Sequence, residues 1–450
     1  MQVPRDLPRT IGFFGAAGIM VGVTIGSGIF KTPFGIANAI GSPWLILGLW
    51  VVGGVLSLFG ALTFTELAVM FPRSGGVYNF LREGFGRRVA FTFGWTYMLL
   101  TKPFAASAIA VVTIEYLAGM FGRELSRWEL AAAVCGELVL LTGLNTLGMR
   151  LGAGVGAFLT ALKMLAVGAI AVLAFTLPGG SLGNLTSAPQ ELPLLAGITA
   201  AMSAVLWSYD GWSDVGSVAG EVKDPQRTLP RVYLAGTLAV IAIYLIVNVA
   251  YMMVIPLEVM RTKEVGEAGV ASSAMQVLVG GRGSQIVSAM IVLSTLGATH
   301  ASIITGARVT FAQSQDGLLY RFLSKVSGKS ETPAVALWTQ CALSCLAITV
   351  LGNFQSLAEG FVFTMWIFYG LAGASIFVLR ARQPGTPRVF RCPGYPFVPG
   401  LFVLAAFAMT VLSIVGSPET TLPWFGVLAL GWPAYWVWGA VTKPTAGAPG

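Results

Sequence analysis

Long apolar runs separated by short polar connections form the most regular pattern of this sequence. Most of the runs extend over about 20 residues, the length that an α-helix needs to cross a lipid bilayer. The connections carry turn-forming residues, as in Gly41-Ser42-Pro43 and Pro178-Gly179-Gly180. The pattern predicts an all-α integral membrane protein with twelve transmembrane helices, at residues 10–40, 44–70, 89–118, 128–147, 153–177, 196–220, 231–255, 285–314, 333–352, 355–380, 398–416 and 421–441.

Three small residues, Gly26-Ser27-Gly28, interrupt the first run near its middle. Each glycine costs about 1 kcal/mol relative to alanine in a helix interior. A break here frees backbone groups that hydrocarbon cannot satisfy, so they must face protein or a wet cavity. The N–H groups after the break attract an anion and the carbonyls before it attract a cation, so the break could hold both ends of a zwitterion. A glycine packing face between helices explains the same residues equally well.

The sixth run contains a second interruption, at Asp210-Gly211. An acid at the bilayer centre costs several kcal/mol and usually marks a pathway or an ion pair. The first and sixth runs each begin a set of five, so the two breaks predict a 5+5 inverted repeat with broken helices 1 and 6 and a site at the midplane. The predicted units are a first repeat at 1–180, a second at 190–382, two further helices at 396–441 and a disordered tail at 442–450.

Composition and charge agree with a membrane protein. The chain has 450 residues, of which 55% are hydrophobic and only 10% are charged, against a usual charged share of about 25%. The net charge of +8 could suggest nucleic acid, but most basic residues lie in the connections of one side, including both ends of the chain. The positive-inside rule then predicts a multi-pass protein of the cell (inner) membrane with both termini in the cytoplasm, and no nucleic-acid partner.

No pattern typical of an enzyme or of a cofactor site occurs. The sequence has neither a Walker motif nor a Gly-x-Ser-x-Gly elbow. An integral membrane enzyme, as an alternative class, would need acids and histidines gathered at one depth, and the chain has a single histidine. The four cysteines lack the spacing of a zinc site or of a disulfide framework. We therefore expect no enzyme activity, no cofactor and no metal.

Several motifs, in order along the chain, carry a family resemblance. The stretch Gly26-Ser27-Gly28-Ile29-Phe30 resembles the first-span motif of the amino acid–polyamine–organocation (APC) superfamily. The stretch Tyr209-Asp210-Gly211-Trp212, followed by Glu221-Val222-Lys223-Asp224-Pro225, is similar to the L-amino acid transporter (LAT) family, with a prokaryotic member as the expected source. The resemblance implies the leucine-transporter fold, which is a standard example of an inverted-repeat transporter. It also implies transport of neutral L-amino acids by alternating access, commonly by sodium-independent exchange (an antiporter).

The resemblance also implies a substrate site at the two breaks. The backbone of Ser27 and Gly28 would hold the substrate carboxylate, with help from the Ser27 hydroxyl, and Gly26 would belong to the same substrate-binding stretch. The ammonium group would be held by main-chain carbonyls, those of Thr24, Trp207, Ser208 and Asp210. Trp207 would also act as a gating lid on the outer side, with ordinary aromatic packing as the alternative.

Two polar residues leave the substrate class open. If the side chain of Asp210 faces the pocket, a cationic amino acid or polyamine becomes the favoured substrate, whereas a structural hydrogen bond is the plain alternative. His300, in the eighth predicted span, could contact a proton or the substrate because histidine titrates near neutral pH. A hydrogen-bonded structural histidine is the alternative, so His300 is only a possible specificity residue.

Lys163 lies in the middle of the fifth predicted span. Such a lysine costs about 2.5–3.5 kcal/mol on insertion scales, so it should face the bundle and find acceptors. Carbonyls near Ile25 and hydroxyls such as Ser294 and Thr295 are candidates. The resemblance implies that its ammonium replaces the sodium ion of related transporters and couples the first-span break to the eighth span. A purely structural ion pair and a proton-coupling role are the alternatives.

Further charged residues near the predicted spans are left without assigned partners: Glu66, Lys102, Glu115 and Glu137. Glu221 and the charges after it suggest a cytoplasmic gate, with a solvated loop as the equal alternative. Some members of the resembled family pair with a single-span glycoprotein through a disulfide. The connection between the third and fourth runs has no cysteine, so we expect no disulfide-linked glycoprotein subunit.

Overall fold

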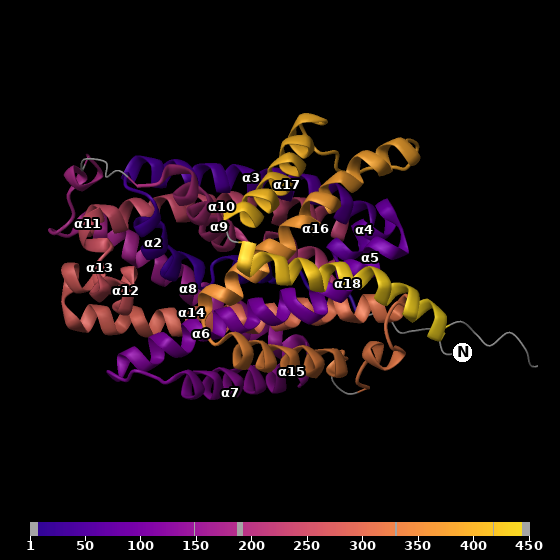
Figure 1. Cartoon of the computed structure of the whole chain (residues 1–450), viewed down its shortest axis with the longest axis horizontal. Coiled ribbons are helices and arrows are strands. Elements are labelled where there is room, and N and C mark those ends of the chain that lie inside the picture. Colours follow the sequence, from indigo (N-terminus) through magenta and orange to yellow (C-terminus); the bar gives the residue numbers. More distant parts are fainter. Residues whose placement is uncertain (1–7, 148, 187–191, 329–330, 417, 443–450) are drawn as a thin grey trace, which may run out of the picture.

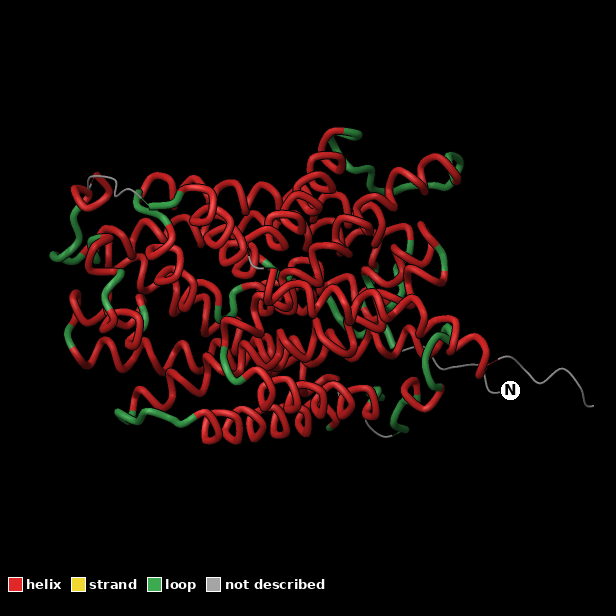
Figure 2. The backbone as a smooth tube through the Cα atoms, viewed as in Figure 1, coloured by secondary structure: helices red, strands yellow, loops and turns green. Residues whose placement is uncertain are grey.

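The computed structural model describes residues 8–147, 149–186, 192–328, 331–416 and 418–442. Across these residues the chain is helical, apart from loops and one bridge between Ile11 and Val222. Most helices run along the long axis of the molecule, with loops gathered at its two ends (Figure 2). The elements are α1 Phe13–Thr24, α2 Gly28–Ala39, α3 Pro43–Met70, α4 Val77–Phe85, α5 Arg87–Thr96, η1 Tyr97–Thr101, α6 Lys102–Met120, α7 Arg127–Thr146, α8 Met149–Thr176, η2 Leu182–Thr186, α9 Leu194–Tyr209, η3 Trp212–Glu221, α10 Pro225–Val254, α11 Leu257–Met260, α12 Lys263–Ala268, α13 Val270–Val279, α14 Gly281–Gln315, η4 Arg321–Ser324, α15 Ala334–Leu351, α16 Phe354–Arg382, α17 Phe397–Gly416 and α18 Pro418–Thr442.

The apolar runs of the sequence are helices in the structure. Within the described residues, nine helical segments are long and apolar enough to cross a membrane: α1 with α2, α3, α5 through α6, α7, α10, α14, α15, α16 and α17. The other predicted spans coincide with α8, with α9 and η3, and with α18. The chain is therefore a multi-pass helical membrane protein, and the count of twelve crossings stays a prediction.

Local structure departs from the predicted spans in three places. The third run is not one continuous α-helix, because the π-helix η1 separates α5 from α6. The sixth run continues after its break as the 3₁₀-helix η3 rather than as an α-helix. The connection at 256–284 contains three short helices, α11 to α13. The predicted tail lies outside the described residues, except for Thr442 at the end of α18.

The packing order places the interrupted helices inside the bundle. α6 lies against α14, and α7 and α15 lie side by side along one edge next to them (Figure 1). α1 packs against α8, α10 and α14, while α2 packs against α9. The two broken segments are thus enclosed by other helices, which is what the free backbone groups at membrane depth require.

One end of the bundle, which we call the charged face, is joined by ion pairs and hydrogen bonds. It is the end at which α4 and α5 lie, whereas α11 to α13 lie at the opposite end (Figure 1). Asp316, which follows α14, accepts hydrogen bonds from Arg82 and Tyr78 of α4. Burial and the neighbouring Asp316 carboxylate raise the pKa of the Tyr78 hydroxyl, so Tyr78 stays a neutral donor.

A buried ion pair lies further inside the charged face. The side chains of Arg308 on α14 and Glu221 at the end of η3 are each 1% exposed, with Nε and Oε1 3.0 Å apart. The main chain of Ile11 hydrogen-bonds both neighbours of Val222, through Glu221 O at 2.9 Å and Lys223 N at 2.8 Å. The partner of Glu221 is therefore Arg308 rather than the charges that follow it in sequence. These contacts tie the N-terminal segment, η3 and α14 together.

A second buried carboxylate, Glu66 of α3, also belongs to this end. It accepts hydrogen bonds from Arg380 and from the main chain of Cys392, and Arg388 lies 3.2 Å away. Since one fully buried acid gathers two guanidinium groups, α3, α16 and the segment after α16 are held together at a single point.

We expect Glu221→Gln to destabilise the folded protein by about 3–5 kcal/mol, because it removes the carboxylate whose negative charge lies against the buried guanidinium group of Arg308. The measurement is thermal unfolding of the purified protein in detergent. Arg227→Gln is the matched control, because Arg227 and Asp224 form an exposed pair at 3.9 Å, of a kind that contributes less than about 1 kcal/mol. Equal effects of the two substitutions would contradict the assigned role of the buried pair.

Candidate functional site

The two helix breaks meet in the middle of the bundle. α1 ends at Thr24 and α2 begins at Gly28, while α9 ends at Tyr209 and η3 begins at Trp212. A Cβ atom added to Gly28 would lie 2.5 Å from Ser208 Cα, and one added to Gly211 would lie 2.7 Å from Thr24 N. Gly211 also has a positive φ of 118°, which favours glycine. Each break therefore needs its glycine because the main chain of the other break approaches so closely.

Side chains from neighbouring helices form hydrogen bonds with main-chain groups that the helix breaks leave free. The Tyr244 hydroxyl of α10 lies 2.7 Å from the carbonyl oxygen of Thr24 and 2.8 Å from that of Ser208, so its one hydrogen can be donated to either. The Thr32 hydroxyl of α2 lies 2.9 Å from the Ser208 hydroxyl. The two breaks are thus bridged by side chains as well as by direct contact, which fixes one break relative to the other.

Lys163 of α8 holds the end of α1. Its side chain is buried, and Nζ donates to the carbonyl oxygens of Gly22 and Ile25, both at 2.7 Å. The carbonyl of Ile25, near which the sequence analysis expects acceptors for the Lys163 ammonium group, is thus one of its two acceptors. The expected hydroxyl acceptors on α14 are not used: Thr295 bonds within α14 and with Thr113, and the Ser294 hydroxyl has no partner among the described residues. Among the described residues, Lys163 thus bonds to α1 alone, through two of its three ammonium hydrogens.

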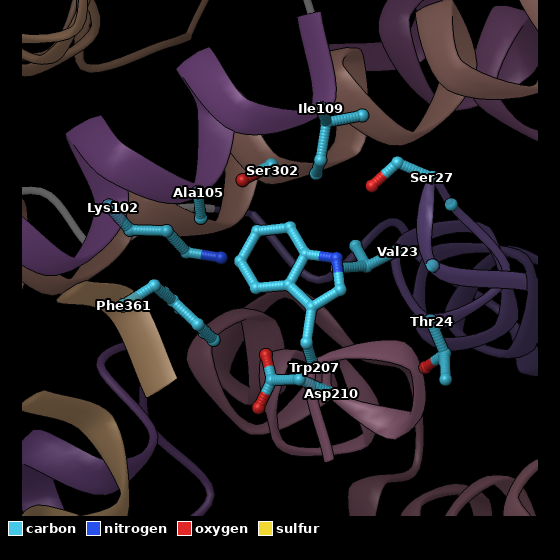
Figure 3. Close-up of a pocket in the computed structure, with 12 residues that line it drawn as sticks. Val23, Thr24, Ser27, Lys102, Ala105, Ile109, Trp207, Asp210, Ser302 and Phe361 are labelled. Carbon is cyan, nitrogen blue, oxygen red and sulfur yellow. The ribbon is translucent and has the colours of Figure 1, made fainter. Parts of the chain in front are cut away.

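A small cavity of about 20 Å³ lies between the two breaks, which we call the central cavity. Such a volume has room for about one water molecule. In Figure 3 the indole of Trp207 lies in the middle of the surrounding side chains. The lining residues are Val23, Thr24, Gly26, Ser27, Gly28, Lys102, Ala105, Ile109, Trp207, Asp210, Ser302 and Phe361. Six of the predicted substrate-binding residues are among them; Ser208 lies behind Gly28, and neither Lys163 nor His300 contributes to this lining.

One wall of the central cavity offers hydrogen-bond donors. α2 begins at Gly28, and the first N–H groups of a helix have no acceptor within it. The Ser27 hydroxyl is buried and has no hydrogen-bond partner among the described residues. This wall can therefore bind an anion such as a carboxylate.

The opposite part of the cavity carries acidic groups. Asp210 Oδ1 accepts a hydrogen bond from the Tyr369 hydroxyl at 2.7 Å. Lys102 Nζ pairs with Asp214 Oδ2 at 2.6 Å, with both side chains almost completely buried. Because one cation faces two acids, a positively charged group entering this part is favoured electrostatically. The cavity thus combines an anion-binding and a cation-binding side.

Trp207 separates the central cavity from a larger one. Its ring packs edge-on against Phe354 and Phe361 of α16, with ring centroids 5.6 and 5.2 Å apart. Beyond it lies a cavity of about 670 Å³, which we call the vestibule. The vestibule is lined by Trp207 itself and by the ion pair of Lys31 and Glu115, among other residues. A third cavity, of about 160 Å³, lies at the charged face beside Arg82 and Asp316.

Several residues of the site escaped the sequence analysis. Lys102 was noticed as a charge in an apolar run, but its partner Asp214 was not recognised although it lies one turn after Asp210. Tyr244, Tyr369 and Phe361 carry no signal, because an aromatic residue in an apolar run most often means packing. Their roles follow only from which helices lie beside the breaks.

Two broken helices that meet around a central cavity, with larger cavities nearer the two ends of the bundle, are typical of helical membrane transporters. Residues 11–439 of the chain match the sequence profile of a family described as "Amino acid permease". This chain belongs to that amino acid permease family, in the APC superfamily and with LAT-type relatives, and its members are membrane transporters rather than enzymes.

Individual relatives align with almost the whole length of this chain. The serine/threonine exchanger SteT of Bacillus subtilis is 30% identical over 407 residues, which is 90% of each chain. The b(0,+)-type amino acid transporter 1 of Mus musculus is 30% identical over 92% of this chain and 84% of its own. The cystine/glutamate transporter of Homo sapiens is 29% identical over 97% and 86%. Amino acid transport is thus the activity of the family to which the chain belongs.

We expect Gly28→Ala to lower substrate affinity at least tenfold, because the added methyl group forces α2 away from Ser208 and displaces the N–H groups that face the cavity. Gly48→Ala is the control, since a Cβ there meets no atom within 4 Å. The measurement is binding of a labelled substrate to purified protein, with thermal unfolding of each variant as a check on folding. Unchanged affinity in Gly28→Ala would show that the break does not contact the substrate.

Proposed function

We propose that this chain is a secondary transporter that moves neutral L-amino acids by alternating access, in sodium-independent exchange. The observation that carries the proposal is the contact of two broken helices around one cavity. Free N–H groups and the Ser27 hydroxyl lie on one side of this cavity, and Asp210 lies on the other. An α-amino acid carries a carboxylate and an ammonium group on the same carbon, so it matches both sides at once.

In this proposal the main chain of Ser27 and Gly28 holds the carboxylate, with help from the Ser27 hydroxyl. Gly26 lines the same cavity, and its own N–H donates to the Thr24 carbonyl at 2.8 Å. The carbonyls of Thr24, Trp207, Ser208 and Asp210 hold the ammonium group. The Tyr244 hydroxyl has a single hydrogen, so it donates to only one of the Thr24 and Ser208 carbonyls at a time and leaves the other open to the ammonium group. Trp207 is the lid, because it lies between the central cavity and the vestibule and lines both.

Neutral substrates are favoured because both acidic groups near the cavity already have partners. Asp214 is already paired with Lys102, and Asp210 accepts from Tyr369. The remaining wall is apolar, with Ala105, Ile109 and Phe361. The second candidate is a cationic amino acid or a polyamine. The observation in its favour is that Asp210 lines the cavity while one lysine faces two acids.

The same proposal includes the architecture and its orientation. Twelve helices would cross the cell (inner) membrane, with units 1–180 and 190–382 as inverted repeats, 396–441 as two further helices and both termini in the cytoplasm. The charged face would then be cytoplasmic and the vestibule would open outward, so this conformation is closed on the inside. No disulfide-linked glycoprotein subunit is proposed, because the four cysteines are free and none lies between α6 and α7.

The test is uptake of a labelled amino acid into proteoliposomes, either preloaded with unlabelled amino acids or empty. A panel of neutral, cationic and anionic amino acids and polyamines competes for uptake. We expect uptake that requires preloading, that neutral L-amino acids inhibit, and that continues when choline replaces sodium. Inhibition by lysine or a polyamine alone would favour the second candidate, and a strict requirement for sodium would refute the mechanism.

A separate prediction concerns Lys163. We expect Lys163→Ala to lose at least ten times more turnover than substrate binding, because the end of α1 loses both hydrogen bonds of the ammonium group. Lys163→Arg, which keeps the charge and several donors, is the matched control and should retain part of the activity. The measurements are exchange in proteoliposomes and binding in detergent. Full exchange by Lys163→Ala would show that its ammonium group does not replace sodium.

A further inference from the structure

An acidic residue without a cationic partner lies in the middle of the bundle, away from the central cavity. Glu137 is halfway along α7 and is only 7% exposed. Within the described part of the chain, no salt bridge involves it, and Oε2 has no hydrogen-bond partner. An unpaired carboxylate at this depth is so costly that the group neutralises instead.

The hydrogen bonds around Glu137 show which form it takes. Its Oε1 lies 3.4 Å from the Thr113 hydroxyl of α6. Thr113 donates its single hydrogen to the Thr295 hydroxyl at 2.8 Å, and Thr295 donates its own to the carbonyl of Ile291 at 2.9 Å. No hydrogen is then left between Thr113 and Glu137, unless the glutamate itself supplies it. The Thr299 hydroxyl, which also lies beside the carboxyl, is a further acceptor for such a proton.

Other titratable groups on the helices packed against α7 are engaged elsewhere or are uncharged donors. On α8, Lys163 bonds to α1, and on α6, Glu115 pairs with Lys31 and Tyr116 donates to Phe30. Lys102 of α6 pairs with Asp214, and Arg308 of α14 pairs with Glu221. The other described groups on these helices are Arg282 and His300 of α14 and the thiols of Cys341 and Cys345 of α15. None of these groups forms a hydrogen bond or an ion pair with Glu137 in the described residues. A proton is thus the cation that is left to neutralise it.

Glu137 is connected to the central cavity through both neighbouring helices. Thr113 lies one turn after Ile109 on α6, and Thr299 lies one turn before Ser302 on α14. Ile109 and Ser302 both line the central cavity. A change in the charge of Glu137 therefore acts on two helices that form the wall of that cavity.

We propose that Glu137 is a proton-binding site, occupied in this conformation, whose proton is required for the transport cycle. The proton neutralises the carboxyl group and supplies the missing hydrogen between α7 and α6. Its loss puts an unpaired negative charge between α6, α7 and α14. This inference goes beyond the exchange mechanism proposed above. The competition assay at a single pH tests that mechanism, whereas the experiments below test the proton site.

The first experiment measures the initial rate of exchange in proteoliposomes as a function of pH, with equal pH on both sides and with sodium replaced by choline. We expect the wild-type rate to fall as the pH rises, by up to about tenfold per pH unit once the carboxyl group ionises. Glu137→Gln, which is permanently neutral and of the same shape, should be active with a rate that stays level over that range. His300→Gln is the control for the one histidine, and it should keep the wild-type pH dependence. Identical pH profiles of wild type and Glu137→Gln, or loss of the dependence only in His300→Gln, would overturn the proposal.

The second experiment needs no variant. A hydrophobic carbodiimide reacts with protonated carboxyl groups in membranes, and mass spectrometry of the wild-type protein identifies the modified residue. We expect Glu137 to be modified, at a rate that falls with rising pH. Glu129 of the same helix is the internal control, because it is exposed and forms a capping box with Ser126, so it should stay ionised and unmodified. Absence of modification at Glu137 at every pH would overturn the proposal even if Glu137→Gln failed to fold.

Discussion

The structure depends on the contact of two broken helices at membrane depth. Gly28 lies against Ser208 and Gly211 lies against Thr24, with no room for a side chain at either glycine. Each break frees main-chain groups that lipid cannot satisfy. Lys163, Tyr244 and Thr32 supply hydrogen bonds to the broken ends and their side chains. The helices that carry these residues therefore have to surround α1 and α9, which determines much of the packing order of the bundle.

The sequence predicts the elements of this fold better than their connections. Apolar runs predict the helices because lipid imposes one length and one hydrogen-bonding solution on each crossing. The break at Gly26-Ser27-Gly28 was predictable because glycine is costly in a helix, and the position of Asp210 because acids are rare there. The π-helix η1 was not predictable, since its residues Tyr97–Thr101 read as an ordinary apolar stretch. Its position just before Lys102 follows from tertiary packing that a local pattern does not contain.

Within the site, partners were harder to predict than positions. Lys163, Glu221 and Lys102 were all recognised as charges that need neutralising, and the structure gives them carbonyls, Arg308 and Asp214, respectively. Arg308 lies 87 residues from Glu221, so no spacing rule connects them. A partner on another helix depends on the rotation and depth of both helices. Periodicity gives neither quantity in helices that are apolar on nearly every side.

The position of Trp207 between two cavities has a consequence for apparent affinity. In the proposed gating role of Trp207, a solute in the vestibule would reach the central cavity only after the indole leaves its edge-on contacts with Phe354 and Phe361. Each such aromatic contact contributes about 0.5–1.5 kcal/mol, so the displaced rotamer is populated at roughly 1–15% if nothing else compensates. The apparent affinity equals the intrinsic affinity multiplied by the fraction of molecules in which the indole is displaced. Phe354 does not line the central cavity. By its contact with Trp207 it would nevertheless change the apparent affinity for a solute bound in that cavity, although Phe354 does not touch the solute there.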